Sequence, residues 1–224
     1  MSAAADAATA PAALRARLRA RLAGTRPSGP GEGTLAGLPR EISDRYRHLL
    51  PAALTKAAVL VPILDHADGL TVLLTERAPD LRHHPGQISF PGGRLETSDA
   101  GPLEAALRET EEEIGLPRGG IEVLGFLPDH LIVTGYSITP VVALVAPGRP
   151  LRLDPVEVAS VFEVPLAFLL DPANHRLRRR PVGDGFIELY DIPFGQRNIW
   201  GATAGMLLTL CRLLAPPPAA ETPA

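Results

Sequence analysis

One amphipathic helix lies between two groups of apolar runs, and this order limits the folds that the chain can adopt. The helix is predicted at Pro102–Ile114, because proline suits a first helical turn and Gly115 with Pro117 ends it. Before the helix, the apolar runs Lys56–Leu64 and Leu70–Arg77 are separated by the letters DHADG, which is typical of a hairpin. The core therefore starts with two strands followed by one helix.

Further apolar runs continue this alternation after the helix. Strands are predicted at Ile121–Leu127, at Ser137–Val145, at SVFEVPL (160–166) and at FIELYDI (186–192), followed by a closing helix at Asn198–Leu214. Strands interrupted by single helices cannot bury both faces of a sheet unless the helices cover them. The order predicts an α/β sandwich with a mixed β-sheet.

Composition excludes several classes of protein. The chain has 224 residues, of which 46% are hydrophobic, enough for one well-buried domain. The net charge of -3 gives no basic field for nucleic acid, and no apolar run approaches the roughly 18 residues of a membrane span. Cys211 is the single cysteine and cannot form an internal disulfide, which favours a cytoplasmic location.

The two ends of the chain differ from its middle. Residues 1–40 are rich in Ala, Arg, Pro and Gly, and residues 215–224 are rich in Pro and Ala, so both are predicted to be mobile extensions of a domain at 41–214. An organelle transit peptide stays open for the N-terminus, which lacks the apolar segment of a secretory signal. The oligomeric state is not fixed by the sequence, and a homodimer stays open.

The helix at 102–114 separates apolar from acidic side chains. At about 3.6 residues per turn, one side holds Leu103, Leu107, Thr110 and Ile114, and another holds Glu109, Glu112 and Glu113. Glu104 and Glu111 fall outside that acidic group and are predicted to be surface charges. Hard cations such as Mg²⁺ prefer carboxylate oxygens, so the acidic group is either a metal site or an ordinary solvated face.

The segment GGRLETSDAGPLEAALRETEEEIGL resembles the Nudix box, the signature of a family that hydrolyses nucleoside diphosphates linked to another group. The second half of the signature corresponds to Arg108–Leu116, with Thr110 where the pattern has an aliphatic residue. Asp99 stands for the first glutamate of the pattern, and eight residues instead of seven separate it from Arg108.

The segment before the box resembles the signature of one branch of that family, the coenzyme A pyrophosphatases. The matching residues are Leu73, Leu74, Thr75, Arg77, Ala78, Arg82, Gly86, Phe90, Pro91, Gly92 and Gly93. The letters IWGATA at 199–204 are also similar to that branch. The resemblance covers most of residues 53–214 and leaves both ends out.

The resemblance implies a fold, a cofactor and a set of site residues. The fold is a Nudix-type α/β/α sandwich with a catalytic loop-helix-loop, and the cofactor is Mg²⁺ or Mn²⁺. The implied metal ligands are Glu109, Glu112 and Glu113; the implied catalytic residues are Glu109, Glu112, Arg108 and Glu157; the implied substrate-binding residues are Arg77, Arg82, Gln87, Gly92 and Gly93. A divalent cation there would polarise a phosphoryl oxygen and acidify a water molecule.

Two roles stay open within this set. The general base is either a box glutamate or Glu157, for which a solvent-facing turn is the other interpretation. Arg108 is expected to orient the box carboxylates through charge-assisted hydrogen bonds, the alternative being a surface arginine.

The predicted reaction is hydrolysis of the diphosphate bond of coenzyme A or a CoA derivative, giving 3',5'-ADP and 4'-phosphopantetheine or its derivative. The first alternative is a Nudix pyrophosphatase acting on ADP-ribose, a dinucleotide or a nucleoside triphosphate. The second is a non-catalytic Nudix-fold nucleotide-binding protein. The sequence does not fix the number of metal ions or the preference among free, oxidised and acylated CoA.

Overall fold

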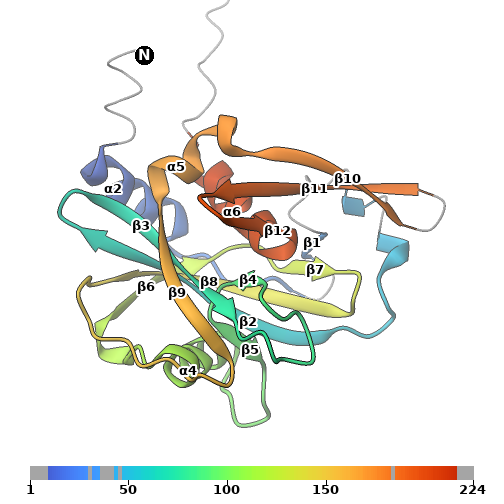
Figure 1. Ribbon diagram of the computed structural model, residues 1–224, viewed down its shortest axis with the longest axis horizontal. Coiled ribbons are helices and arrows are strands. Elements are labelled where there is room, and N and C mark those ends of the chain that lie inside the picture. The colour runs from blue at the N-terminus through green and yellow to red at the C-terminus, as the bar shows by residue number, and fades with distance from the viewer. Residues whose placement is uncertain (1–9, 30–31, 36–42, 45–46, 183–184, 216–224) are drawn as a thin grey trace, which may run out of the picture.

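A computed structural model describes residues 10–29, 32–35, 43–44, 47–182 and 185–215 (Figure 1). The helices are α2 (Pro11–Leu22), α4 (Pro102–Ile114), α5 (Leu166–Leu170) and α6 (Gly201–Leu214), with single 3₁₀ turns at Arg47–Leu49, Arg118–Gly120 and Pro172–Asn174. The strands are β1 (Thr34–Leu35), β2 (Thr55–His66), β3 (Gly69–Arg77), β4 (Ile88–Ser89), β5 (Gly92–Arg94), β6 (Ile121–Phe126), β7 (His130–Ile132), β8 (Tyr136–Val145), β9 (Val158–Pro165), β10 (Arg176–Val182), β11 (Gly185–Phe194) and β12 (Arg197–Trp200).

A mixed sheet forms the centre of the molecule. In the described part of the chain its main path runs β1-β7-β8-β2-β3-β4, with β5 paired to β2, β6 to β8 and β9 to β3. The central strand β2 is parallel to β8 and antiparallel to β3. A smaller antiparallel sheet consists of β10, β11 and β12.

The two faces of the central sheet bury different helices, because side chains alternate along a strand. On one face, Val61 and Ile63 of β2 pack in the same apolar cluster as residues of α2, α5 and α6. On the other face, Ala58 and Leu60 pack with the apolar side of α4. Figure 1 shows α4 on one side of the sheet and α2, α5 and α6 on the other. The predicted α/β sandwich with a mixed sheet is therefore confirmed.

The predicted hairpin and central helix are confirmed. β2 and β3 pair antiparallel across the turn at 67–68, and α4 begins at Pro102 and ends at Ile114 as expected. The predicted start of the closing helix is wrong: residues 198–200 pair with β11 as part of β12, and α6 begins at Gly201. The helix starts later because residues 198–200 are paired with β11 in the sheet.

The N-terminal segment differs from the expectation of a mobile extension. Residues 11–22 form α2, and its side chains Leu14, Leu18 and Leu22 are only 2%, 0% and 0% exposed. Leucines four residues apart lie on one side of a helix, so this stripe packs into the apolar cluster shared with α6. Residues 1–9 and 216–224 lie outside the described residues, and their predicted mobility stays a prediction.

Arginines on α2 also tie it to the domain. Arg15 pairs with Asp65 of β2, and Arg17 Nη1 donates a hydrogen bond to the carbonyl of Leu214 at 2.6 Å. Helix α2 is therefore part of the folded unit. No helix among the described residues is long and apolar enough to cross a membrane.

Candidate functional site

Helix α4 is held between two glycine-containing turns. Gly101 precedes Pro102 at the start of the helix, and Gly115 caps its end in the left-handed conformation with φ of 67°. A residue with a side chain is disfavoured at that φ, which explains glycine at this C-cap. These turns fix where the glutamates of α4 lie relative to β2 and β5.

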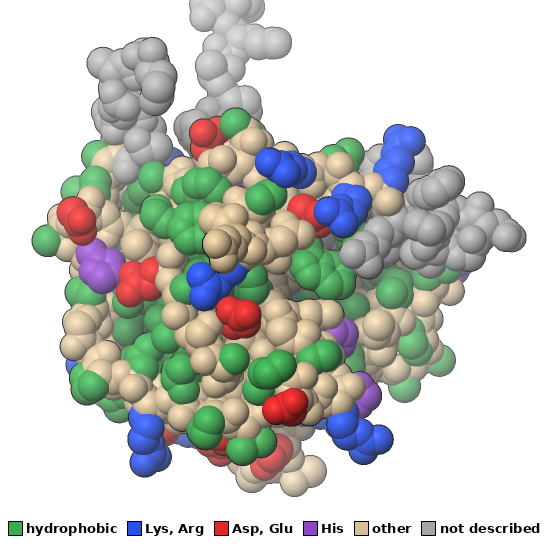
Figure 2. Space-filling view, viewed as in Figure 1, with side chains coloured by type: hydrophobic (Ala, Val, Ile, Leu, Met, Phe, Trp, Pro, Cys, Tyr) green, Lys and Arg blue, Asp and Glu red, His purple; other side chains and the backbone are tan. Residues whose placement is uncertain are grey.

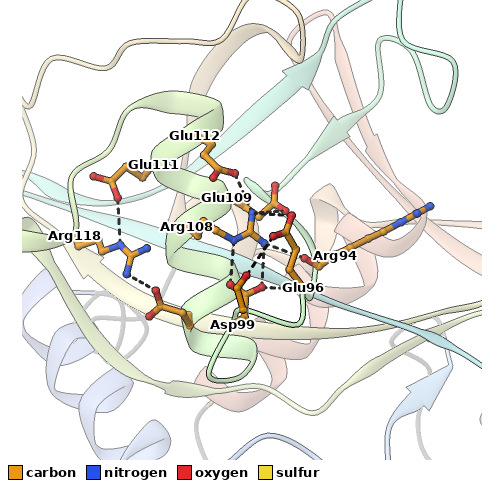
Figure 3. Close-up of polar contacts among 10 residues, drawn as sticks. Arg94, Glu96, Asp99, Arg108, Glu109, Glu111, Glu112 and Arg118 are labelled. Carbon is orange, nitrogen blue, oxygen red and sulfur yellow. Dashed lines mark hydrogen bonds and ion pairs between the residues drawn. The ribbon is translucent and has the colours of Figure 1, made fainter.

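Arg108 links the loop before α4 to the acidic side of the helix (Figure 3). Its guanidinium donates from Nε and Nη2 to the two carboxylate oxygens of Asp99, each at 3.0 Å. Its Nη1 donates to Glu109 at 3.1 Å and to Glu112 at 3.0 Å. The hydrogen bonds from Arg108 hold the pKa of Asp99 below its usual value. The predicted orienting contacts of Arg108 are thus present, and Asp99 is its bidentate partner.

Glu113 lies on the buried side of α4 and not on its solvated side. Its exposed fraction is 5%, and its Oε2 accepts a hydrogen bond from the backbone N–H of Gly92 at 3.2 Å. The pKa of Glu113 is raised to about 8, mainly by burial and also by the nearby Glu157, while the Gly92 hydrogen bond and the charge of Arg77 oppose the shift. The helical pattern grouped Glu113 with the acidic face, but the covering sheet and loop place it in the interior.

Two glycines let the backbone of β5 approach the carboxylates. A Cβ on Gly93 would lie 2.4 Å from the carboxyl carbon of Glu109, and a Cβ on Gly92 would lie 2.4 Å from the carbonyl oxygen of Ala58. Gly92 also has φ of 147°, which favours glycine. Any side chain at Gly93 would occupy the space taken by the Glu109 carboxylate.

Burial also raises the pKa of Glu109, against the opposing effect of Arg108. Glu112 and Glu157 contribute to the same upward shift of the Glu109 pKa. The carboxylates of Glu109, Glu113 and Glu157 therefore lie close enough to repel one another, although Glu157 comes from the loop before β9. Glu112 is 59% exposed and lies at the rim, bound to Arg108.

Arg77, at the end of β3 in the segment before the box, is close enough to Glu113 for the two charges to interact. The loop after β3 closes on that residue, since Gly86 N–H donates to the carbonyl of Arg77 and Arg77 N–H donates to the carbonyl of Gln87. The Nε of Arg77 is buried and has no hydrogen-bond partner in the described structure. Gln87 is half-buried, and Arg82 is exposed on the loop. No ion pair joins Arg82 to a box carboxylate among the described residues.

The donor set suits a hard divalent cation, because it consists of carboxylate oxygens in a partly dehydrated setting. Within the described part of the chain, no three acidic, histidine or cysteine side chains are drawn together as a ready-made metal site. Glu109 and Glu112 are held by Arg108, and Glu113 by Gly92, so binding a cation would require these carboxylates to turn toward a common centre. Burial, and to a smaller extent mutual repulsion, raise the pKa of Glu109 and of Glu113, and the charge of a bound cation would oppose both effects.

The other acidic residues of α4 lie on the opposite side. Arg118 Nη1 donates to Glu104 at 2.6 Å, and its Nε donates to Glu111 at 3.2 Å (Figure 3). These are exposed pairs, in line with the prediction that Glu104 and Glu111 are surface charges. The role of Asp99 as the anchor of Arg108 was not predicted, although its place as the first acidic residue of the box was a usable signal.

Comparison with known proteins shows the family. The model of the NUDIX domain matches residues 54–184. The uncharacterized Nudix hydrolase NudL of Escherichia coli (strain K12) is 43% identical over 164 residues, which cover 69% of this chain and 80% of the relative.

Two solved structures are also similar. The Nudix hydrolase RenU of M. smegmatis is 25% identical with a TM-score of 0.44, covering 51% of this chain and 73% of that one. The C. elegans Ap4A hydrolase binary complex is 20% identical with a TM-score of 0.44, covering 50% and 80%. With more than half of its residues matched by the family model, and with a close relative at 43% identity, this chain belongs to the Nudix domain family.

Proposed function

We propose that the protein is a divalent-metal-dependent hydrolase that cuts the diphosphate bond of coenzyme A or a CoA derivative. The products are 3',5'-ADP and 4'-phosphopantetheine or its derivative. One observation carries the proposal: the segment that resembles the CoA pyrophosphatase signature closes on Arg77, beside the buried Glu113 of the box helix. The signature and the acidic helix thus contribute to a single site.

We assign the Mg²⁺ or Mn²⁺ ligands to Glu109, Glu112 and Glu113. Their oxygens are the ligand type that hard cations prefer, and two of the three carboxylates have a raised pKa that a positive charge would reverse. The bound cation would neutralise charge on the diphosphate and acidify the attacking water. Because Gly93 has no side chain, the Glu109 carboxylate can lie where a Cβ would otherwise be.

The chain's own residues supply positioning and proton transfer. Arg108 fixes Glu109 and Glu112 through hydrogen bonds while Asp99 fixes Arg108. Glu157 is exposed at the edge of the same acidic group. Its carboxylate can therefore accept a proton from water without breaking a buried contact. We assign the general base to Glu157, with a box glutamate as the alternative.

Arg77 is the best candidate for a contact to the diphosphate. A buried guanidinium nitrogen without a partner loses its hydrogen bond to water, and an anionic oxygen would restore it. Arg82 and Gln87 lie on the loop that starts at Arg77, which suits contacts to the part of CoA beyond the diphosphate. We also place the activity in the cytoplasm, where the unpaired and buried Cys211 would stay reduced.

A substrate panel tests the proposal. Purified protein with Mn²⁺ or Mg²⁺ should cleave CoA with kcat/KM at least about tenfold above that for ADP-ribose, NADH and diadenosine polyphosphates, a difference of about 1.4 kcal/mol in transition-state binding. Mass spectrometry should detect 3',5'-ADP and 4'-phosphopantetheine. Arg82→Ala should narrow that preference more than it slows the poorer substrates.

Two outcomes would replace the proposal. Faster cleavage of ADP-ribose or a dinucleotide than of CoA and its thioesters would leave a Nudix pyrophosphatase of another specificity. Binding of nucleotides without turnover of any panel member would leave a non-catalytic binding protein.

A further inference from the structure

A cavity lies on the α4 side of the sheet, and none of the box carboxylates lines it. Its volume is about 390 Å³, at the lower end of the roughly 300–1,000 Å³ range typical of small-molecule sites. Its floor includes Leu64 of β2, Leu73 of β3 and Val145 of β8, and Leu116 and Leu151 line it from the loops after α4 and β8. Figure 2 shows hydrophobic side chains gathered on the visible face around β3 and β9.

The cavity is distinct from the acidic site. Leu73 and Arg77 lie on the same face of β3, four residues apart, which is about 13 Å along a strand. Between the two places, the loop after β8 hydrogen-bonds to the end of α4: Arg152 N–H donates to the Ile114 carbonyl and Asp154 N–H donates to the Glu113 carbonyl, each at 2.9 Å. This wall separates an apolar cavity from the carboxylates.

The two ends of the cavity carry opposite charges. Arg149 lies beyond the end of β8, and Glu163 lies on β9. Because β8, β2, β3 and β9 are successive neighbours, three strand spacings separate the ends, about 14 Å. The floor between these two side chains is apolar.

Among the described residues, only one of these two charged side chains already has hydrogen-bond partners. Glu163 Oε2 accepts hydrogen bonds from His66 at 2.6 Å and from Thr71 at 2.5 Å. Within the described part of the chain, no carboxylate pairs with Arg149. Its guanidinium lies over Gly120, where a Cβ would be 2.2 Å from the guanidinium carbon. The cavity therefore has an apolar floor and, at one end, the Arg149 guanidinium without a carboxylate partner among the described residues.

We propose that this cavity binds a small amphipathic carboxylate, with its apolar chain on Leu64 and Leu73 and its anionic head at Arg149. Charge complementarity selects the ligand: a cationic head would meet the Arg149 guanidinium, and an uncharged one would leave it uncompensated. Burial of each methylene on the apolar floor should strengthen binding. The site is independent of the proposed CoA hydrolysis, since none of its residues belongs to the acidic group.

Isothermal titration calorimetry with butanoate, hexanoate and octanoate on the full chain tests the proposal. We expect one octanoate per chain, with affinity rising about fourfold per added methylene until the cavity is filled. Octylamine should bind much more weakly than octanoate. Arg149→Gln should weaken octanoate binding about tenfold, while Arg152→Gln, an exposed arginine of the same loop, should not change it.

Two further variants keep the test decisive. Ala146 is exposed and contributes to the cavity, so Ala146→Phe should block it without disturbing the core. Glu109→Gln, in the acidic site, should leave octanoate binding unchanged. The proposal is overturned if octanoate does not bind with one-to-one saturation, if octylamine binds equally well, if Arg149→Gln and Arg152→Gln behave alike, or if Glu109→Gln abolishes binding.

Discussion

At the scale of single residues, the hydrogen bonds of Arg108 depend on the planar shape of its guanidinium group. Two of its nitrogens bind both oxygens of Asp99, and a third binds Glu109 and Glu112, a geometry that a lysine ammonium cannot reproduce. Arg108→Lys should therefore release the carboxylates and lower kcat/KM roughly 10- to 100-fold, while circular dichroism stays native. Arg118→Lys is the matched control on the other side of α4. Equal losses in both variants would contradict a positioning role for Arg108.

Glu113 should make the metal-free protein less stable as pH rises. Its pKa of about 8 in the folded state lies above the ordinary value of 4.5, so the folded protein binds the proton more tightly than the unfolded chain does. Stability from this group is present below pH 4.5 and is lost as pH rises through 8. His130 acts in the opposite direction, because burial lowers its pKa from 6.5 to about 4. Its contribution to the free energy of unfolding therefore increases with pH only up to pH 6.5.

The window between pH 6.5 and 8 therefore isolates Glu113. In the presence of a chelator, the free energy of unfolding should fall by about 1–2 kcal/mol across it, which lowers the thermal midpoint by roughly 3–6 °C. Glu113→Gln should flatten this slope, and added Mg²⁺ should reduce it. A wild-type midpoint that stays constant or rises between pH 6.5 and 8 would show that Glu113 is not buried in its proton-binding form.

At the scale of elements, the two sides of α4 should differ in function. Glu109→Gln removes a charge that faces Gly93 and should lower hydrolysis by orders of magnitude, with a higher Mn²⁺ concentration needed for half-maximal rate. Glu111→Gln removes the same charge from the side that pairs with Arg118 and should have little effect. Rates measured over a Mn²⁺ titration check both variants. Similar rates in the two would remove the basis for assigning the acidic side to metal binding.

Local signals predicted some elements and long-range pairing decided others. Pro102 and Gly115 bound α4, and both can be read without knowing the rest of the fold. Residues 198–200 look like the start of a helix, but pairing with β11 makes them a strand, which no local pattern shows. Pairing with β11 likewise makes residues 176–180 part of β10. Burial of Glu113 likewise depends on β5 and the loop before β9, elements distant in sequence.

At the scale of the whole molecule, composition was a poor guide to where the folded unit begins. The Ala- and Arg-rich N-terminus has the content of a mobile segment, yet the spacing of Leu14, Leu18 and Leu22 gives α2 one apolar side. The sheet face shared with α6 supplies a surface that this side can bury. The spacing of these three leucines therefore explains the packing of α2, which the average composition of the first forty residues does not.

This packing leads to a stability prediction for α2. Leu18 is fully buried, so Leu18→Ala should leave a cavity and lower the free energy of unfolding by about 2–5 kcal/mol, which lowers the thermal midpoint by roughly 5–15 °C. Arg21→Ala, on the exposed side of the same helix, should change the free energy by no more than about 0.5 kcal/mol. Thermal unfolding followed by circular dichroism compares the two. Equal midpoints for both variants would mean that α2 does not pack on the domain in solution, and that the first forty residues are the mobile extension that their composition predicts.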